Sequence, residues 1–79
     1  MSRLINIGFG NVVNSDKIVS VITPDSAPAK RIIQRAKENE EIVDATQGRK
    51  TKSVIITDSG RIVLSAVLPE TIAGRFNEI

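Results

Sequence analysis

Three cations stand within four residues of one short polar stretch, residues 47–53, which is the part of the sequence best suited to binding an anion. The cations are Arg49, Lys50 and Lys52, and the stretch contains no acidic and no apolar residue. Arginine binds phosphate oxygens in a forked geometry, and lysine adds a compact charge. Loops of this kind carry function when a rigid scaffold fixes them. This stretch, called the basic loop below, is predicted to bind phosphate; the alternative is an ordinary solvated turn.

A second group of cations lies on the strongest predicted helix. Asp25 or Ser26 can cap its start, and Pro28 suits its first turn. Helical spacing places one apolar stripe on the helix: Ala29, Ile32, Ile33 and Ala36. The cations fall on the opposite side: Lys30, Arg31, Arg35 and Lys37. The helix is expected to end at residues 38–40, where acids oppose its dipole. Its basic side is expected to point outward, to DNA, to a neighbouring subunit or simply to water.

The remaining apolar segments predict an α+β fold around a small mixed or antiparallel sheet. Strands are expected at residues 4–7, with 12–13 continuing or restarting the first, and at 18–23, 42–45, 54–57 and 62–67. Two glycines around Phe9 indicate a tight bend. Gly60 supplies a positive φ to the last hairpin. A short helix begins at Pro69, with Ile72, Ala73 and Phe76 as its apolar side and Arg75 outward.

The last two strands are apolar at consecutive positions, so both faces of the sheet should be covered. One amphipathic helix cannot cover both. We therefore expect a neighbouring copy to cover the second face, or the sheet edge to pair across an interface. Self-association would also stabilise a chain of 79 residues, predicted to be one domain over 1–79, that lacks cysteine for disulfides.

Composition argues against several functional classes. With neither histidine nor cysteine, the chain offers no usual zinc site and no obvious acid–base pair, so no enzyme activity, metal, cofactor or small-molecule substrate is expected. Two phenylalanines are too few for a base-stacking platform. No signal peptide and no apolar run of roughly 20 residues are found, which predicts a cytoplasmic protein. Duplex DNA held through phosphate and groove-shape contacts remains.

Segments along nearly the whole chain resemble one family, the RemA family of bacterial regulators of extracellular-matrix genes. The segments are Leu4-Ile5-Asn6-Ile7-Gly8-Phe9-Gly10-Asn11, residues 24–33 with their Ser-Ala-Pro helix start, Asp44-Ala45-Thr46 leading into residues 48–52, and Pro69-Glu70-Thr71. The resemblance implies a small α/β fold assembling into rings, with DNA on or around the ring and matrix genes activated. It implies DNA contact at Arg49, Lys50 and Lys17. The family tends to have two adjacent arginines in the loop, whereas here the second is Lys50.

The function expected from the sequence is therefore a homo-oligomeric, nucleoid-associated transcriptional regulator that binds double-stranded DNA and activates biofilm genes. The predicted DNA-binding residues are Arg49, Lys50, Lys52, Lys17, Lys30, Arg31 and Arg35. Two alternatives from other classes stay open. One is a structural self-assembly module whose basic loop meets the acidic residues 38–44 of a neighbour, and the other is an RNA-binding accessory protein.

Overall fold

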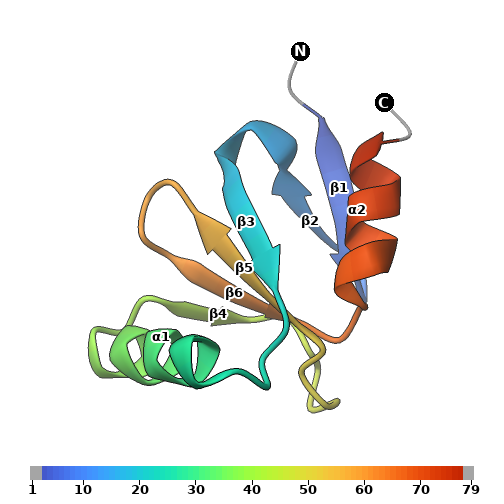
Figure 1. The fold of residues 1–79 in the computed structure, drawn as a ribbon. Coiled ribbons are helices and arrows are strands. Elements are labelled where there is room, and N and C mark those ends of the chain that lie inside the picture. The colour runs from blue at the N-terminus through green and yellow to red at the C-terminus, as the bar shows by residue number, and fades with distance from the viewer. Residues whose placement is uncertain (1–2, 78–79) are drawn as a thin grey trace.

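The structure is a computed structural model that describes residues 3–77, with two sheets and two helices (Figure 1). The elements follow the order β1 (Leu4–Gly8), β2 (Asn11–Asn14), a 3₁₀ turn η1 (Ser15–Lys17), β3 (Ile18–Ile22), α1 (Ala27–Glu38), β4 (Ile42–Asp44), β5 (Ser53–Thr57), β6 (Ile62–Ser65) and α2 (Pro69–Asn77). The α+β class and both helices are confirmed. The predicted strands ran slightly too far, since Thr23, Ala45 and residues 66–67 lie outside them.

Four strands form the main sheet, in the order β3-β5-β6-β4. β5 pairs antiparallel with β3 and β6, while β4 runs parallel to β6, so the sheet is mixed. Successive residues of a strand point to opposite faces. Val54 and Ile55 accordingly belong to two different apolar clusters, one on each side of the sheet.

Helix α1 covers one face of this sheet (Figure 1). Ser26 caps it by accepting a hydrogen bond from the Ala29 amide, and Pro28 sits in its first turn, as predicted. Ala29 and Ala36 are buried. The cluster beneath the helix joins Ala36 to Val54, Ile62 and Leu64, with Ile32 and Ile33 packed against it.

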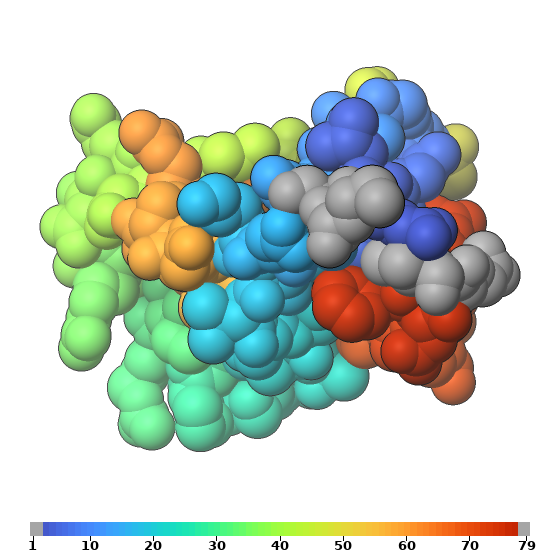
Figure 2. Space-filling view, turned by 90° about the horizontal axis from the view of Figure 1, so that it is seen from above, coloured from blue at the N-terminus to red at the C-terminus, as the bar shows by residue number. Residues whose placement is uncertain are grey.

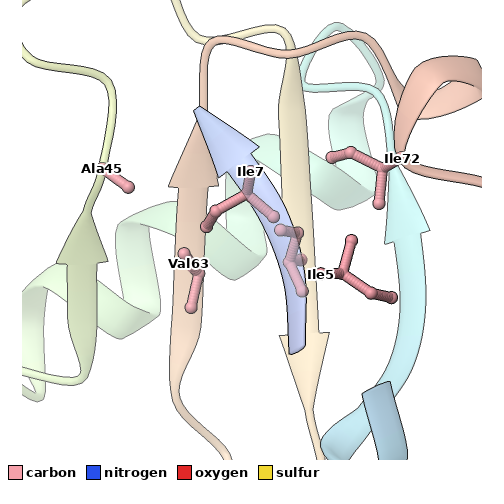
Figure 3. Close-up of a cluster of buried hydrophobic side chains, with 6 residues drawn as sticks. Ile5, Ile7, Ala45, Val63 and Ile72 are labelled. Carbon is pink, nitrogen blue, oxygen red and sulfur yellow. The ribbon is translucent and has the colours of Figure 1, made fainter. Parts of the chain in front are cut away.

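The second face is covered by the chain itself, through the β1–β2 hairpin and α2 (Figure 1). Figure 3 shows Ile5 and Ile7 of β1 beside Val63 and Ile72, in a cluster completed by Ala45 and Ile55. The expectation that a neighbouring copy covers this face is therefore wrong, while pairing of the sheet edge across an interface stays a prediction. The hairpin is a separate two-stranded sheet that folds over the main one, an arrangement of residues far apart in sequence that periodicity does not reveal.

Helix α2 also differs from the prediction. Ile72 is buried as expected, but Ala73 and Phe76 are exposed. Arg75 was expected to point outward. Instead it is half-buried and donates a hydrogen bond from Nη1 to the Asn6 carbonyl oxygen at 2.6 Å, which attaches α2 to β1.

Candidate nucleic-acid interface

The basic loop (residues 47–53) is held firmly at its first end. Thr46, which precedes it, is buried, and its amide and hydroxyl donate to Asp44 Oδ1 at 2.9 and 2.6 Å. The Ala45 amide donates to Leu64 at 2.9 Å, and the Arg49 amide donates to Thr46 at 2.9 Å. The chain then turns sharply through Gln47 and Gly48, both with positive φ.

The second end of the loop joins the sheet directly. The Lys52 amide donates to the Ser65 carbonyl at 2.8 Å, and the hydroxyl of the fully buried Ser53 donates to the Val67 carbonyl. Between these anchors the three cations Arg49, Lys50 and Lys52 are all exposed. The structure therefore places three exposed charged side chains on a fixed backbone, and the fixed backbone lowers the entropy cost of binding.

The Asp44 carboxylate is the electrostatic part of the first anchor. The Thr46 hydroxyl, and then the Thr46 amide, hold the pKa of Asp44 below its ordinary value of 3.8. Burial opposes this shift, and the charge of Lys37 makes the smallest contribution to lowering the pKa. A group with a lowered folded pKa stabilises the fold above its unfolded pKa, and that contribution is lost as the pH falls through the folded pKa. The anchor should therefore be intact at neutral pH and weaken in acid.

Thr46→Val is expected to lower the melting temperature at pH 7 by about 4–8 °C, because a hydrogen bond to a partly solvated carboxylate contributes about 1 kcal/mol. The difference from the parent protein should be smaller in acid, at about pH 2, because protonation of Asp44, whose pKa is lowered from 3.8, removes the charge from this hydrogen bond. Thermal unfolding followed by circular dichroism at the two pH values measures this. Thr51→Val makes the same change within the loop and should stay within about 0.5 kcal/mol of the parent. An equal loss at both pH values would contradict the role of the Asp44 charge.

Phe9 lies beside the basic loop, a neighbour that the sequence analysis did not identify. The Arg49 guanidinium carbon is 5.9 Å from the centroid of the Phe9 ring. Phe9, Arg49, Lys50, Lys52 and Ala66 together line a shallow hollow of about 320 Å³. An exposed aromatic ring and the three cations of the loop thus share one surface, called the Phe9 surface below.

The backbone of Phe9 is in the left-handed region, with φ of +54°, and Gly10 follows at +78°. Two positive φ values in a two-residue hairpin turn are typical of type I′, which favours Asn-Gly. A bulky residue there costs roughly 1–2 kcal/mol. The cation–π contact lies near its outer limit of about 6 Å, where an exposed pair contributes about 0.5–1 kcal/mol. The contact with Arg49 therefore does not by itself offset the strain.

A second hollow, of about 250 Å³, lies on the other side of Lys50 and Lys52 and is lined also by residues 23–25 and 68–69. Asp25 is the acid in this lining. Its carboxylate reduces the positive potential on that side. The Phe9 surface, which has no acid in its lining, is accordingly the more electropositive of the two.

Lys17 lies at the opposite end of the main sheet from the basic loop. It ends η1, where its Nζ is 3.8 Å from Asp58 Oδ2 and its carbonyl accepts from the Asp58 amide at 2.9 Å. Figure 2 looks onto this end, with the sky-blue segment before β3 beside the orange β5–β6 turn. Strand β5, about 14 Å long at roughly 3.4 Å per residue, separates this end from the loop. Within one chain Lys17 is not part of the same site.

The predicted cations of α1 form another separate surface. Lys30, Arg31 and Arg35 are exposed residues of α1. The helix itself lies on the face of the main sheet opposite the β1–β2 hairpin (Figure 1). Arg31 and Arg35 line a hollow of about 310 Å³ together with Glu41. The structure thus brings together Arg49, Lys50 and Lys52 and leaves the other four predicted residues on two other surfaces.

Residues 3–77 contain no cluster of three or more histidine, cysteine or carboxylate side chains suited to a metal ion. Across the same residues, neither helix has the length and apolar character needed to cross a membrane.

A family model described as RemA-like, extracellular matrix regulatory protein A-like, matches residues 4–76. A Lachnoclostridium phytofermentans protein named "Putative regulatory protein" is 62% identical over 78 residues, which is 99% of this chain and 86% of that protein. Relatives with the same descriptive name from Brevibacillus brevis and Acaryochloris marina are 60% and 55% identical. They cover 92% and 94% of this chain and 85% and 84% of their own lengths. The matches include both the basic loop and the hairpin turn of Phe9.

Proposed function

The chain belongs to the RemA-like family, and we propose that it is a DNA-binding transcriptional regulator that activates extracellular-matrix genes. The family and the names of the relatives indicate a regulatory protein rather than an enzyme. The proposal adds that residues 1–79 act as one domain, that the domain assembles into a ring-like homo-oligomer, and that the assembly binds duplex DNA in the nucleoid.

The observation that supports DNA binding most strongly is the anchored basic loop. Arg49, Lys50 and Lys52 project from a backbone that is bonded at both ends to buried parts of the sheet. Phosphate is the ligand that such a set of cations recognises best. With a net charge of only +2, the protein as a whole gives little general attraction for DNA, so local concentration of charge in the loop is required.

Self-association would supply the number of phosphate contacts that a single loop cannot make. Three cations contact few phosphates, and useful affinity follows when several loops bind one duplex. Exposed apolar residues support such assembly: Val19 on the edge strand β3 and Phe76 on α2 line a hollow of about 470 Å³. A contact between two different surfaces of neighbouring copies closes into a ring when its rotation permits.

In such an assembly Lys17 acts on DNA next to the loop of a neighbouring copy. Its contact with Asp58 is long and solvent-exposed, so it contributes little and can be exchanged for a phosphate. Lys30, Arg31 and Arg35 remain secondary candidates, because their surface lies on the opposite face of the sheet from the Phe9 surface.

Affinity for duplex DNA should fall steeply with salt concentration. If two loops bind, about six phosphates are neutralised, and affinity is expected to fall by about a thousandfold between 50 and 200 mM salt. Fluorescence anisotropy of a labelled duplex over a salt series measures the slope of log affinity against log salt. A slope near zero would contradict phosphate binding, and tighter binding of a structured RNA competitor would favour the RNA-binding alternative.

A further inference from the structure

Phe9 is an aromatic side chain that the fold keeps in solvent at a position poorly suited to it. The residue is 48% exposed at the tip of the β1–β2 hairpin and has a positive φ. About half of the Phe9 surface is therefore left in solvent and can contact a partner. Strained, exposed residues that persist on a rigid scaffold are found preferentially at binding sites.

The position of the ring relative to the basic loop is fixed by the hairpin. The Gly8 amide donates to Asn6 Oδ1 at 2.7 Å, and Asn11 Nδ2 donates to the Gly8 carbonyl at 3.1 Å. A Cβ atom on Gly8 would come within 3.1 Å of Val67 Cγ2, so the turn packs closely against the segment that follows β6. The same segment accepts the hydrogen bond of Ser53 at the end of the loop. Turn and loop are thus attached to one support.

The Phe9 surface combines two kinds of contact that duplex DNA can use. Its cations suit the phosphates that border a groove, and its ring adds an apolar contact to the same hollow. Proteins that bend DNA commonly insert an apolar side chain between base pairs from the minor groove, where neighbouring cations hold the backbone. Pyrimidine–purine steps such as TA separate most easily under this deformation.

We propose that Phe9 inserts into the minor groove as an apolar wedge between two base pairs, bending the duplex that the basic loop holds. The inference rests on the proposed function, since it assumes that the loop binds duplex DNA. Beyond phosphate binding, the wedge would give the protein an apolar contact with the bases and a preference for deformable base steps. Phe9, which makes this contact, is not one of the charged residues. Arg49, whose guanidinium carbon is 5.9 Å from the ring centroid, contacts the adjacent phosphate or groove wall while the ring enters the stack.

The test compares Phe9→Asn with the parent protein on duplexes that carry or lack a central TA step. Asparagine suits the turn, so the hairpin should be retained while the ring is lost. Phe9→Leu keeps an apolar wedge, and Val12→Thr changes another exposed apolar residue of the hairpin as a matched control. Affinity and salt slope come from anisotropy, and bending comes from energy transfer between dyes at the two duplex ends.

We expect Phe9→Asn to bind the TA duplex about tenfold more weakly, as for the loss of one stacked aromatic contact, with bending and TA preference lost and the salt slope unchanged. Phe9→Leu should be intermediate, and Val12→Thr should match the parent.

Unchanged bending in Phe9→Asn would overturn the wedge while leaving the proposed function standing. A shallower salt slope in Phe9→Asn would overturn the wedge, because it would show that the Phe9 side chain only positions Arg49 on a phosphate. Preference of the parent for single strands would also overturn it, and a parent that binds no DNA would overturn both proposals.

Discussion

Replacing Arg49 and Lys50 together by alanine is expected to abolish the gel retardation of duplex DNA while leaving the elution volume of the protein unchanged. Both side chains are exposed, and the loop is anchored by Asp44, Thr46 and Ser53, which the change leaves intact. Each phosphate contact raises the affinity at 0.1 M salt roughly tenfold over its value at 1 M salt, where the electrostatic contribution is small. The double variant should therefore lose roughly a hundredfold for every loop in contact with DNA.

Lys30→Ala with Arg31→Ala is the matched control for this experiment. It removes the same number of charges, so both variants have a net charge of zero, but it acts on the surface of α1. We expect the control to retain most of the retardation. If the control lost binding and the loop variant kept it, α1 would be the DNA-binding surface. If the loop variant instead dissociated the oligomer, the loop would be a subunit contact, as in the self-assembly alternative.

Ser65→Ala is expected to have the largest effect on stability among single polar substitutions. Ser65 is fully buried, and its hydroxyl donates to the Ile7 carbonyl at 2.8 Å and accepts from the Val67 amide at 3.0 Å. Alanine leaves both partners without this bond in the interior, at a cost of about 2–3 kcal/mol. In a domain of this size that corresponds to a fall of at least about 8 °C in the melting temperature.

The loss should be accompanied by loosening of the β1–β2 hairpin, since the Ser65 hydroxyl bonds β6 to β1. Hydrogen exchange of β1 amides measures this directly, and thermal unfolding gives the overall cost. Ser59→Ala removes an exposed hydroxyl from the β5–β6 turn and should change stability by less than about 0.5 kcal/mol. A Ser65→Ala protein that melts within a degree of the parent would show that the hairpin is held by its apolar contacts alone.

Helix α1 illustrates what local sequence signals can predict. Its cap at Ser26, its early Pro28 and the Ala29 to Ala36 stripe act within a few residues of one another, so they identify the helix and its buried side. The hairpin closed by Gly60 was predicted for the same reason. These elements depend on neighbouring residues, and the sequence displays those neighbours directly.

The second layer of the fold could not be predicted in that way. The β1–β2 hairpin is attached to the rest by bonds from Ser65 to Ile7 and from Arg75 to Asn6, across 58 and 69 residues. The pattern of apolar residues in 4–14 does not specify which face of the main sheet the hairpin will cover. Without that layer, the apolar strands predicted a neighbouring copy on the second face, and this ground for self-association was wrong. Pairing of the sheet edge across an interface, and the need of a small chain without disulfides for further stabilisation, stay predictions.

The residues of the candidate site also differ in whether local sequence could predict them. Arg49, Lys50 and Lys52 are close in sequence, so their common surface could be predicted. Phe9 joins them through a contact between residues 40 positions apart. A signal did exist: a bulky residue before Gly10, where a type I′ turn favours asparagine. Lys17 shows the reverse case, because only the pairing of β3 with β5 places it at the far end of the sheet.

The most direct test of the proposed function is the mass of the particle that forms with DNA. Light scattering on the protein mixed at about 50 mM salt with a duplex long enough for several loops is expected to give one species containing the duplex and several copies of the chain. An 8.6 kDa protein that elutes separately from the duplex would contradict both the assembly and the DNA binding.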